Sequence, residues 1–385
     1  MQIKINSFMA SFMFLFISYL GIANCNQEAF KNTKDSKEKE ILESILKSAK
    51  QNHILKKRSK KEVQDMLNLL PNESRVYIMR GSINDNIYDA YVKIGSLYNS
   101  DFVLDIVFPS LYNKLDFKNE SITFSLNECE IGLDDSLFIN CVKKQSSKDS
   151  IFSKAEFIAT TCNTCNLHEI DFISSSFEAR KTTKNGNFSY INEISLPFIP
   201  ENNQIKDNVR SRINTAMKAS GDKYIISKSL AKKTKEGFRN FKFDFNAEYI
   251  NNVNLAYVSS KLLMFIENHY IYEGGAHGNT ILSTRAFLLQ NGEELATNIE
   301  ELFDMQKQNE ILALLTKKLK YQKDKLYDLP LHTMPDIFVF DDSGVILMWQ
   351  LYKIAPYSSG IIEVHINFKE LAPFVKKDSV YSFLF

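Results

Sequence analysis

The chain has 385 residues, of which 44% are hydrophobic and 24% charged, a composition typical of globular proteins rather than disordered or collagen-like ones. Its 47 basic and 46 acidic residues give a formal net charge of +1. This balance argues against nucleic-acid binding, because a protein that binds nucleic acid usually needs a basic excess to offset the phosphate charge. Only 13 glycines are present, which disfavours a glycine-rich nucleotide-binding enzyme. The length suggests two or three domains of about 150 residues each.

The amino terminus has the pattern of a lipoprotein signal peptide over residues 1–24. Lys4 is the only charge before an apolar run from Phe8 to Leu20. A run of about 13 residues suits a secretory signal, whereas a bilayer-spanning helix needs about 20. Ile22-Ala23-Asn24-Cys25 resembles a lipobox, although Asn24 is larger than the usual small residue.

We therefore expect acyl chains such as palmitate on Cys25, and a membrane-anchored lipoprotein of the bacterial cell envelope, on its periplasmic side or at the cell surface. An uncleaved membrane anchor and cleavage without lipidation are the two alternatives.

Residues 25–72 are predicted to form a lysine-rich, partly helical tether. Helical periodicity is present between Ile41 and Ala49, and again between Val63 and Leu70. A basic cluster at residues 56–61 separates the two stretches. This cluster is either part of a solvated tether or a collar that contacts anionic lipid headgroups.

The cysteine count fits an exported protein. Without Cys25, four cysteines are left, and they allow three pairings. The local one joins Cys129 to Cys141 and Cys162 to Cys165. Structural disulfides are the favoured interpretation. The alternatives are a redox-active Cys162-Asn163-Thr164-Cys165 pair, free thiols, and a zinc site. The zinc ligands would be the four cysteines, or Cys162 and Cys165 with His168.

Residues 75–182 are predicted to form a β-rich domain of unknown function. Short β-prone runs alternate there with Gly, Pro and Asn, which indicates an antiparallel sheet. The runs lie at Val76–Met79, Ile87–Ile94, Phe102–Phe108, Ile122–Phe124, Ser136–Ile139, Phe152–Ile170 and Phe172–Phe177. Residues 181–187 are polar, contain Asn185-Gly186, and are interpreted as a linker.

The second domain, residues 188–385, mixes helices with strands. Helical spacing predicts helices at Asn202–Ala219 and Ile311–Leu319. Strands are predicted at Phe188–Pro197, Tyr224–Ile226, Phe238–Phe245, Leu255–Tyr272, Ile337–Phe340, Val345–Tyr352 and Ile361–Phe368. The predicted fold class is α+β, with antiparallel sheets, a few helices packed on one face, and two β-rich domains after a helical tether.

Three segments carry a family resemblance: Tyr272–Asn279 (YEGGAHGN), the stretch from Leu295 to Phe303, and Tyr352–Gly360 (YKIAPYSSG). Together they resemble the carboxyl-terminal extracytoplasmic domain shared by RsiV-type anti-sigma factors and PdaC-type peptidoglycan deacetylases, a domain of unknown function. The resemblance covers roughly residues 188–377. It implies an extracytoplasmic domain that binds lysozyme in the anti-sigma factors and accompanies a separate catalytic domain in the deacetylases.

The chain shows neither a sigma-binding segment nor a deacetylase domain, so signalling and deacetylation are not expected to carry over. The predicted function is non-catalytic ligand binding, with a lysozyme-like protein, another envelope protein or a glycan as partner. The ligand-binding candidates are Glu273, Gly274, Gly275, His277, Gly278, Pro356 and Tyr357.

His277 allows a second hypothesis, a cell-wall-modifying hydrolase. In that case His277 is the general base and Glu273 or Asp304 orients it. Convergence of His269, His277 and His365 on a metal is a weaker possibility. The sequence shows no signature of a catalytic nucleophile, metal centre or cofactor, so we expect no cofactor, no metal and no enzymatic activity.

Overall fold

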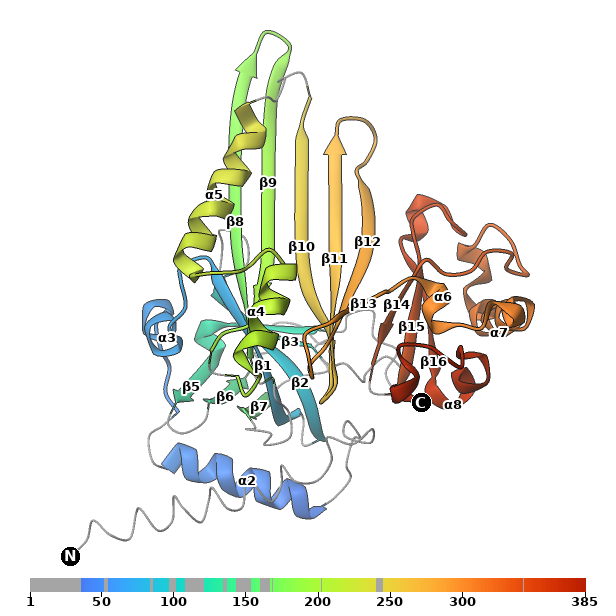
Figure 1. Ribbon diagram of the computed structural model, residues 1–385. Coiled ribbons are helices and arrows are strands. Elements are labelled where there is room, and N and C mark those ends of the chain that lie inside the picture. The colour runs from blue at the N-terminus through green and yellow to red at the C-terminus, as the bar shows by residue number, and fades with distance from the viewer. Residues whose placement is uncertain are drawn as a thin grey trace, which may run out of the picture. The chain divides into compact units, whose positions relative to one another are not determined.

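A computed structural model describes residues 36–51, 55–83, 86–96, 102–107, 121–133, 137–142, 154–159, 167, 169–201, 203–239, 245–341 and 343–385 (Figure 1). The contacts divide the chain into two compact units. The first unit contains the residues up to Phe172 together with Phe198–Asp207. The second contains Ile173–Pro197 and Asn208–Phe385. The predicted α+β class is confirmed.

The first unit is built around antiparallel strands in chain order. β1 (Glu73–Ile83) pairs with β2 (Asn86–Ser96), which pairs with β3 (Phe102–Val107), which pairs with β4 (Ser121–Ser125). β5 (Cys129–Leu133) pairs with β6 (Leu137–Val142), and β7 (Lys154–Ala159) pairs with both β6 and β1. β1, β2, β3, β4 and β6 confirm the runs predicted there, and β5 is an additional strand. The run predicted at Phe152–Ile170 is not one strand, because β7 covers only Lys154–Ala159 and Leu167 is not in a strand. Its last two residues begin the next strand, Glu169–Thr183, which also contains the predicted run Phe172–Phe177.

Two helices precede these strands, α2 (Ser36–Gln51) and α3 (Lys60–Leu67). Val63 and Leu67 of α3 are buried in the same apolar core as the strand residues Val92 and Ile131. Lys57 and Arg58 donate hydrogen bonds to the backbone carbonyls of Asn127 and Ile131. Part of the predicted tether therefore packs on the first unit instead of standing free of it.

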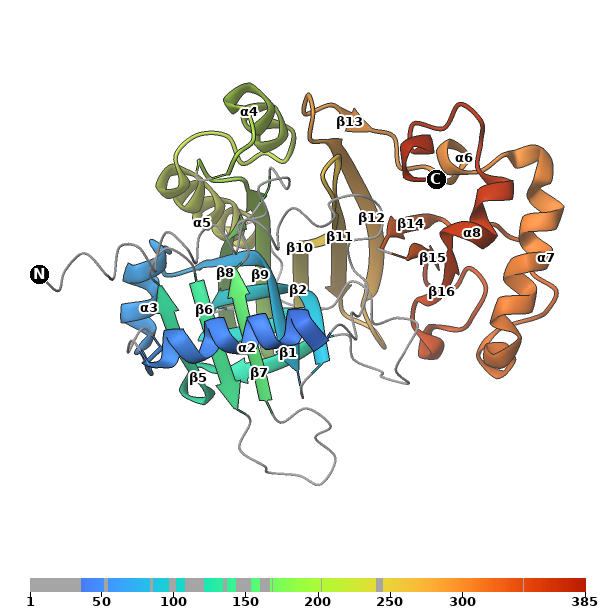
Figure 2. The same ribbon diagram turned by 90° about the horizontal axis from the view of Figure 1, so that it is seen from below.

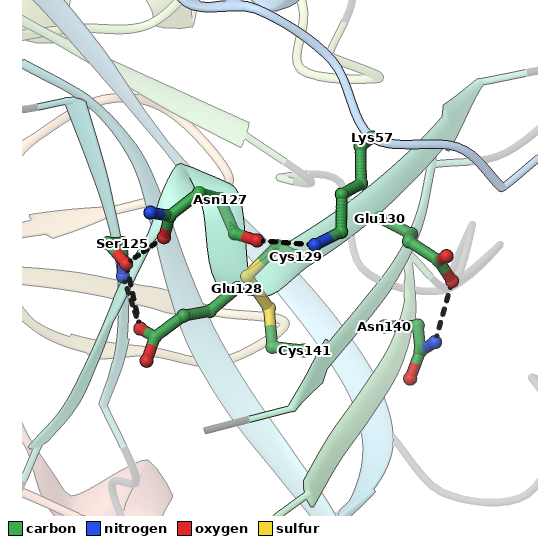
Figure 3. Close-up of a disulfide and its surroundings, with 8 residues drawn as sticks. All are labelled: Lys57, Ser125, Asn127, Glu128, Cys129, Glu130, Asn140 and Cys141. Atoms are coloured by element: carbon green, nitrogen blue, oxygen red, sulfur yellow. Dashed lines mark hydrogen bonds between the residues drawn. A yellow bond between two sulfur atoms is a disulfide. The ribbon is translucent and has the colours of Figure 1, made fainter. Parts of the chain in front are cut away.

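A disulfide joins Cys129 to Cys141, one of the pairings that the sequence leaves open (Figure 3). The two cysteines are directly opposite each other in the β5–β6 hairpin, and both are fully buried. Figure 3 also shows Lys57 bonded to the Asn127 carbonyl next to this hairpin. Cys25, Cys162, Cys165, His168 and the predicted signal peptide lie outside the described residues.

The second unit contains a sheet of long strands. β8 (Glu169–Thr183) and β9 (Gly186–Phe198) are neighbours, and β9 pairs in parallel with β10 (Ala247–Val258). A parallel pair needs a crossover connection, which α4 (Asp207–Ala216) and α5 (Lys223–Arg239) supply here (Figure 1). β11 (Leu262–Glu273), β12 (Asn279–Leu288) and the short β13 (Glu294–Leu295) then follow antiparallel.

A three-stranded antiparallel sheet completes the second unit. It consists of β14 (Ile337–Phe340), β15 (Gly344–Trp349) and β16 (Ile362–Asn367), all predicted from the sequence. α6 (Ile299–Leu302), α7 (Gln308–Leu319) and α8 (Phe368–Leu371) accompany it, with short 3₁₀ turns between them (Figure 2). One apolar core contains Trp349, Phe338 and Leu315 together with Met264 of β11, so the two sheets of this unit share their packing.

Three local predictions are wrong. Tyr224–Ile226 is not a strand, because it lies in the first turn of α5. Phe238 also belongs to α5, so the strand predicted from Phe238 cannot begin there, and residues 240–244 lie outside the described residues. Leu255–Tyr272 is not one strand but most of the β10–β11 hairpin.

The predicted linker at residues 181–187 instead forms the tip of the β8–β9 hairpin. Its Asn185-Gly186 pair occupies the turn, and the φ angle of 140° at Gly186 explains the need for glycine. None of the helices that the structure describes is both long and apolar enough to cross a membrane.

Candidate functional site

The candidate site is formed by two loops of the second unit. The first follows β11 and runs from Glu273 to Gly278. The second connects β15 to β16 and runs from Gln350 to Gly360. Gly274 and Gly275 have φ angles of 85° and 94°, in the region that glycine adopts without steric cost, and they reverse the chain between β11 and β12. This places His277 on the β12 side of the turn.

His277 joins the two loops by a ring stack. Its imidazole lies on the ring of Tyr357, with 3.7 Å between ring centroids and 15° between ring planes. The third ring of this group is Tyr352, whose centroid is 6.1 Å from that of His277 and 5.8 Å from that of Tyr357. Tyr352 is 50% exposed, so the three rings present aromatic surface to solvent.

Both nitrogens of His277 have hydrogen-bond partners. Nδ1 lies 2.8 Å from the backbone oxygen of Gly278, which can only accept, so Nδ1 carries the proton and donates. In the neutral ring Nε2 is then the acceptor, and it receives the hydroxyl hydrogen of Tyr352 at 2.9 Å. The partners therefore select one tautomer and fix the orientation of the imidazole.

Tyr270 and Tyr272 of β11 support the turn from the strand side. The Tyr272 hydroxyl donates to the backbone oxygen of Gly275 at 3.2 Å. A Cβ atom added to Gly278 would lie 2.4 Å from the ring of Tyr270, so only glycine fits there without movement. The pKa of Tyr270 is raised by partial burial and by the nearby charges of Glu248 and Tyr357, with a hydrogen bond from the Gly278 backbone acting against this.

Glu273 is hydrogen-bonded to the neighbouring strand β10. Its carboxylate accepts a hydrogen bond from the hydroxyl of Tyr249 in β10. Burial, followed by this hydrogen bond and the carboxylate charge, raises the pKa of Tyr249. Gly274 lies against the side chain of Phe245. Glu273 and Gly274 therefore brace the outer end of the β10–β11 pair.

The second loop is fastened to its surroundings along its length. The side-chain amide of Gln350 accepts from the backbone N–H of Leu282 in β12 and donates to the backbone oxygen of the same residue. The Ser359 hydroxyl donates to the Lys325 carbonyl at 2.8 Å. Pro356 precedes the 3₁₀ turn Tyr357–Ser359 and presets its entry. These bonds hold Tyr352 and Tyr357 at fixed places beside β12.

The sheet face that carries Tyr270 contains two asparagines with buried side-chain oxygens. Asn252 of β10 and Asn268 of β11 are directly opposite each other, and Tyr270 follows on the same face. The side-chain oxygens of both asparagines are buried and have no hydrogen-bond partner among the residues that the structure describes. A buried acceptor without a hydrogen bond lowers the stability of the fold.

Glu193 of β9 lies on the same face. It pairs with Ile250 of β10, which on its other side pairs with Tyr270 of β11. Glu193 accepts from the Ser176 hydroxyl at 3.2 Å. Its pKa is raised by burial and by the charge of Glu248 on the neighbouring strand, while the Ser176 bond lowers it.

The residues of the hydrolase hypothesis are not brought together. Asp304 does not contact His277 but accepts from the backbone N–H of Gln306 at the start of a 3₁₀ turn. Glu273 has the tyrosine partner described above.

The three candidate metal-binding histidines also have separate surroundings. His365 lies 3.0 Å from Asp341 and contacts Ser343 at the β14–β15 turn, and His269 lies 3.6 Å from Glu267. The described residues contain no group of three or more His, Cys, Asp or Glu side chains arranged to hold a metal ion.

Of the residues that form the site, His277 and Tyr357 are predicted from the sequence, whereas Tyr270, Tyr272, Tyr352 and Gln350 are not. The alternation of Tyr270 and Tyr272 near the end of β11 was the available signal for the first two. The sequence around Gln350 does not indicate its role, because that role is to bond the backbone of Leu282 in β12, which is 68 positions away.

A separate depression of about 430 Å³ beside α7 is lined by Gln308, Asn309, Leu312, Ala313, Thr316, Pro330, Leu331 and His332. It contains none of the predicted ligand-binding residues.

Comparison with known proteins gives one family match. Residues 300–369 match the model of a family described as a protein of unknown function, DUF3298. The match includes the Tyr352–Gly360 loop and excludes Glu273–Gly278. None of the curated proteins matches the chain.

Two crystal structures of DUF3298 family proteins also resemble the chain. The first, from Bacteroides fragilis, is 16% identical, with a TM-score of 0.38, covering 55% of this chain and 97% of that one. The second, from Pseudomonas aeruginosa PAO1, is 17% identical, with a TM-score of 0.37, covering 54% and 94%. The segment that matches the DUF3298 model, residues 300–369, runs from α6 to the first residues of α8.

Proposed function

We propose that this chain is a lipid-anchored protein of the bacterial cell envelope that binds an envelope ligand, a protein or a glycan, without changing it chemically. The observation that carries this proposal is the state of His277. Both of its ring nitrogens are hydrogen-bonded within the protein and its face is stacked on Tyr357. A histidine held in this way fixes the positions of the Tyr352 and Tyr357 rings on the protein surface.

The alternative function, a cell-wall-modifying hydrolase, needs a free basic nitrogen directed at the substrate. Here the Nε2 lone pair accepts the Tyr352 hydroxyl, and neither Glu273 nor Asp304 orients the ring. Catalysis would require Tyr352 to leave His277 and a carboxylate to approach it. Binding requires no such rearrangement, and we therefore favour it.

The chemistry of the surface indicates what kind of ligand fits. Aromatic rings with polar edges offer apolar contact area and hydrogen bonds at a low cost in side-chain entropy. Tyr352 and Tyr357 supply such rings, and the Tyr352 ring is half exposed. A sugar face or an exposed protein loop would use both features. The resemblance to RsiV-type anti-sigma factors makes lysozyme the first protein partner to test.

Calorimetric titration of the full chain with lysozyme, and separately with peptidoglycan fragments, tests the site. Tyr357→Ala removes the ring that stacks on His277 and should weaken binding of the recognised ligand about 30-fold, the loss expected for a central aromatic contact. Tyr352→Phe removes only the hydroxyl and should weaken it less.

Tyr321→Ala is the matched control, because Tyr321 is 78% exposed on a different turn, and it should bind like the parent chain. Equal affinities for the Tyr357→Ala variant and the parent would contradict the proposed site, as would the failure of both ligands to bind.

The membrane anchor is tested separately. We expect the chain to incorporate a labelled lipid precursor and to fractionate with membranes when it is produced in bacteria. Cys25→Ser removes the acceptor thiol and should abolish the label. An unchanged label in the variant, or no label in the parent, would exclude lipidation at Cys25.

A further inference from the structure

We infer that the outer face of α5 is a docking surface for an anionic phospholipid bilayer. This helix contains six basic residues and one acidic residue, in a chain whose total net charge is only +1. The surface shares no residue with the loops around His277, so it is independent of the proposed ligand site.

The inner face of α5 packs against other residues of the second unit. Ile226, Leu230 and Thr234 are buried. The Thr234 hydroxyl bonds to Ser175 of β8, and the Thr234 carbonyl accepts from Asn192 of β9. Figure 1 shows the helix running along these two strands. The inner face therefore determines which residues point outward.

The outward residues form one stripe. Tyr224, Lys228, Lys232, Lys235 and Arg239 recur every three or four positions, which places them on the same side of a helix. All five are exposed, and Ile225 lies beside the first of them. The described structure gives this stripe one acidic partner, Glu236, which lies 3.6 Å from Lys232. Most of the positive charge is therefore available to an external partner.

Two apolar side chains distinguish a bilayer from a soluble polyanion. Tyr224 is 57% exposed and Ile225 is 67% exposed, both in the first turn of the helix. Lys228 lies 4.2 Å from the centre of the Tyr224 ring, so charge and apolar surface are adjacent. Basic residues beside exposed aromatic and aliphatic ones are the pattern of a helix that lies in a membrane interface. A dissolved phosphate polymer would leave both apolar groups in water.

The test measures vesicle binding of the full chain carrying Cys25→Ser, so that no acyl group contributes. Vesicles of phosphatidylcholine alone are compared with vesicles that also contain phosphatidylglycerol. We expect the anionic lipid to strengthen binding and high salt to remove this gain. The variant Lys228→Gln, Lys232→Gln, Lys235→Gln and Arg239→Gln should bind anionic vesicles about 100-fold more weakly, since each surface cation contributes appreciably.

The matched control removes the same charge elsewhere. Lys317, Lys320, Lys323 and Lys325 are exposed in α7 and the turn after it, and changing all four to Gln should alter vesicle binding less than about threefold. Equal losses in the two quadruple variants would overturn the inference, because binding would then follow net charge alone.

A double variant, Tyr224→Gln and Ile225→Gln, identifies the class of partner. It should weaken binding to anionic vesicles about tenfold and leave binding to soluble polyphosphate unchanged. If it binds vesicles like the parent, the surface does not insert into a bilayer, and the inference is overturned in favour of a site for soluble polyanions.

Discussion

Gly278 is a residue at which strand β11 and the first loop are in close contact. The ring of Tyr270 occupies the space that a side chain at this position would need. Gly278 also supplies the carbonyl that accepts from His277. The position therefore couples the packing of β11 to the tautomer of the imidazole.

Gly278→Ala should both destabilise the second unit and weaken ligand binding. The added methyl group must displace the Tyr270 ring, and overpacking of this kind costs about 1–3 kcal/mol. Chemical denaturation gives the free energy of unfolding, and calorimetry gives the affinity. Ala276→Ser adds one atom at an exposed neighbouring position and should change neither quantity appreciably. A Gly278→Ala variant that matches the parent in both would show that Tyr270 does not support the loop.

At this scale the sequence could indicate residues that carry unusual chemistry, but not their partners. His277 and Tyr357 were recognisable because both lie in segments that carry the family resemblance, YEGGAHGN and YKIAPYSSG. Tyr352 was not singled out, because its hydroxyl becomes informative only when the fold brings it to Nε2 of His277, 75 positions away in the sequence. Hydrogen bonds between distant segments leave no local pattern.

Among the elements, most strands were predictable and the turns between them were less so. β14 and β15 were identified because Asp341–Gly344 is a strong turn signal. The β10–β11 turn was missed because it contains no Gly, Pro or Asn. There, the Ser259 hydroxyl accepts from the backbone N–H groups of Lys261 and Leu262 and closes the turn.

The start of α5 was missed for a comparable reason. Tyr224, Ile225 and Ile226 have strand propensity. However, the Asp222 carboxylate accepts from the backbone N–H groups of Tyr224 and Ile225, at 2.8 and 3.4 Å, and so caps the helix. The cap and the buried face of the helix together outweigh the local preference.

The β5–β6 hairpin gives a prediction for the first unit. Replacing both Cys129 and Cys141 with alanine should lower its free energy of unfolding by about 3 kcal/mol, the chain-entropy value for a loop of this length. Thermal and denaturant unfolding measure the change. Val142→Ala, an exposed position in the same hairpin, should cost less than about 1 kcal/mol. A double variant as stable as the parent would mean that the disulfide does not stabilise this unit.

The whole molecule consists of two units with separate apolar cores. The candidate loops and the basic stripe of α5 both belong to the second unit, which also contains the residues that match the DUF3298 model. The sequence predicted two β-rich parts because each has its own series of apolar strands. It could not predict that β8, at its Ile173–Thr183 segment, joins the second unit, because strand pairing between distant segments is not encoded locally.

The central claim is that His277 organises a binding surface and does not catalyse a reaction. Mass spectrometry of peptidoglycan fragments recovered after incubation with the full chain tests this claim directly. We predict intact fragments, with the same result for His277→Gln. Cleaved or deacetylated fragments that form with the parent chain and not with His277→Gln would contradict the claim.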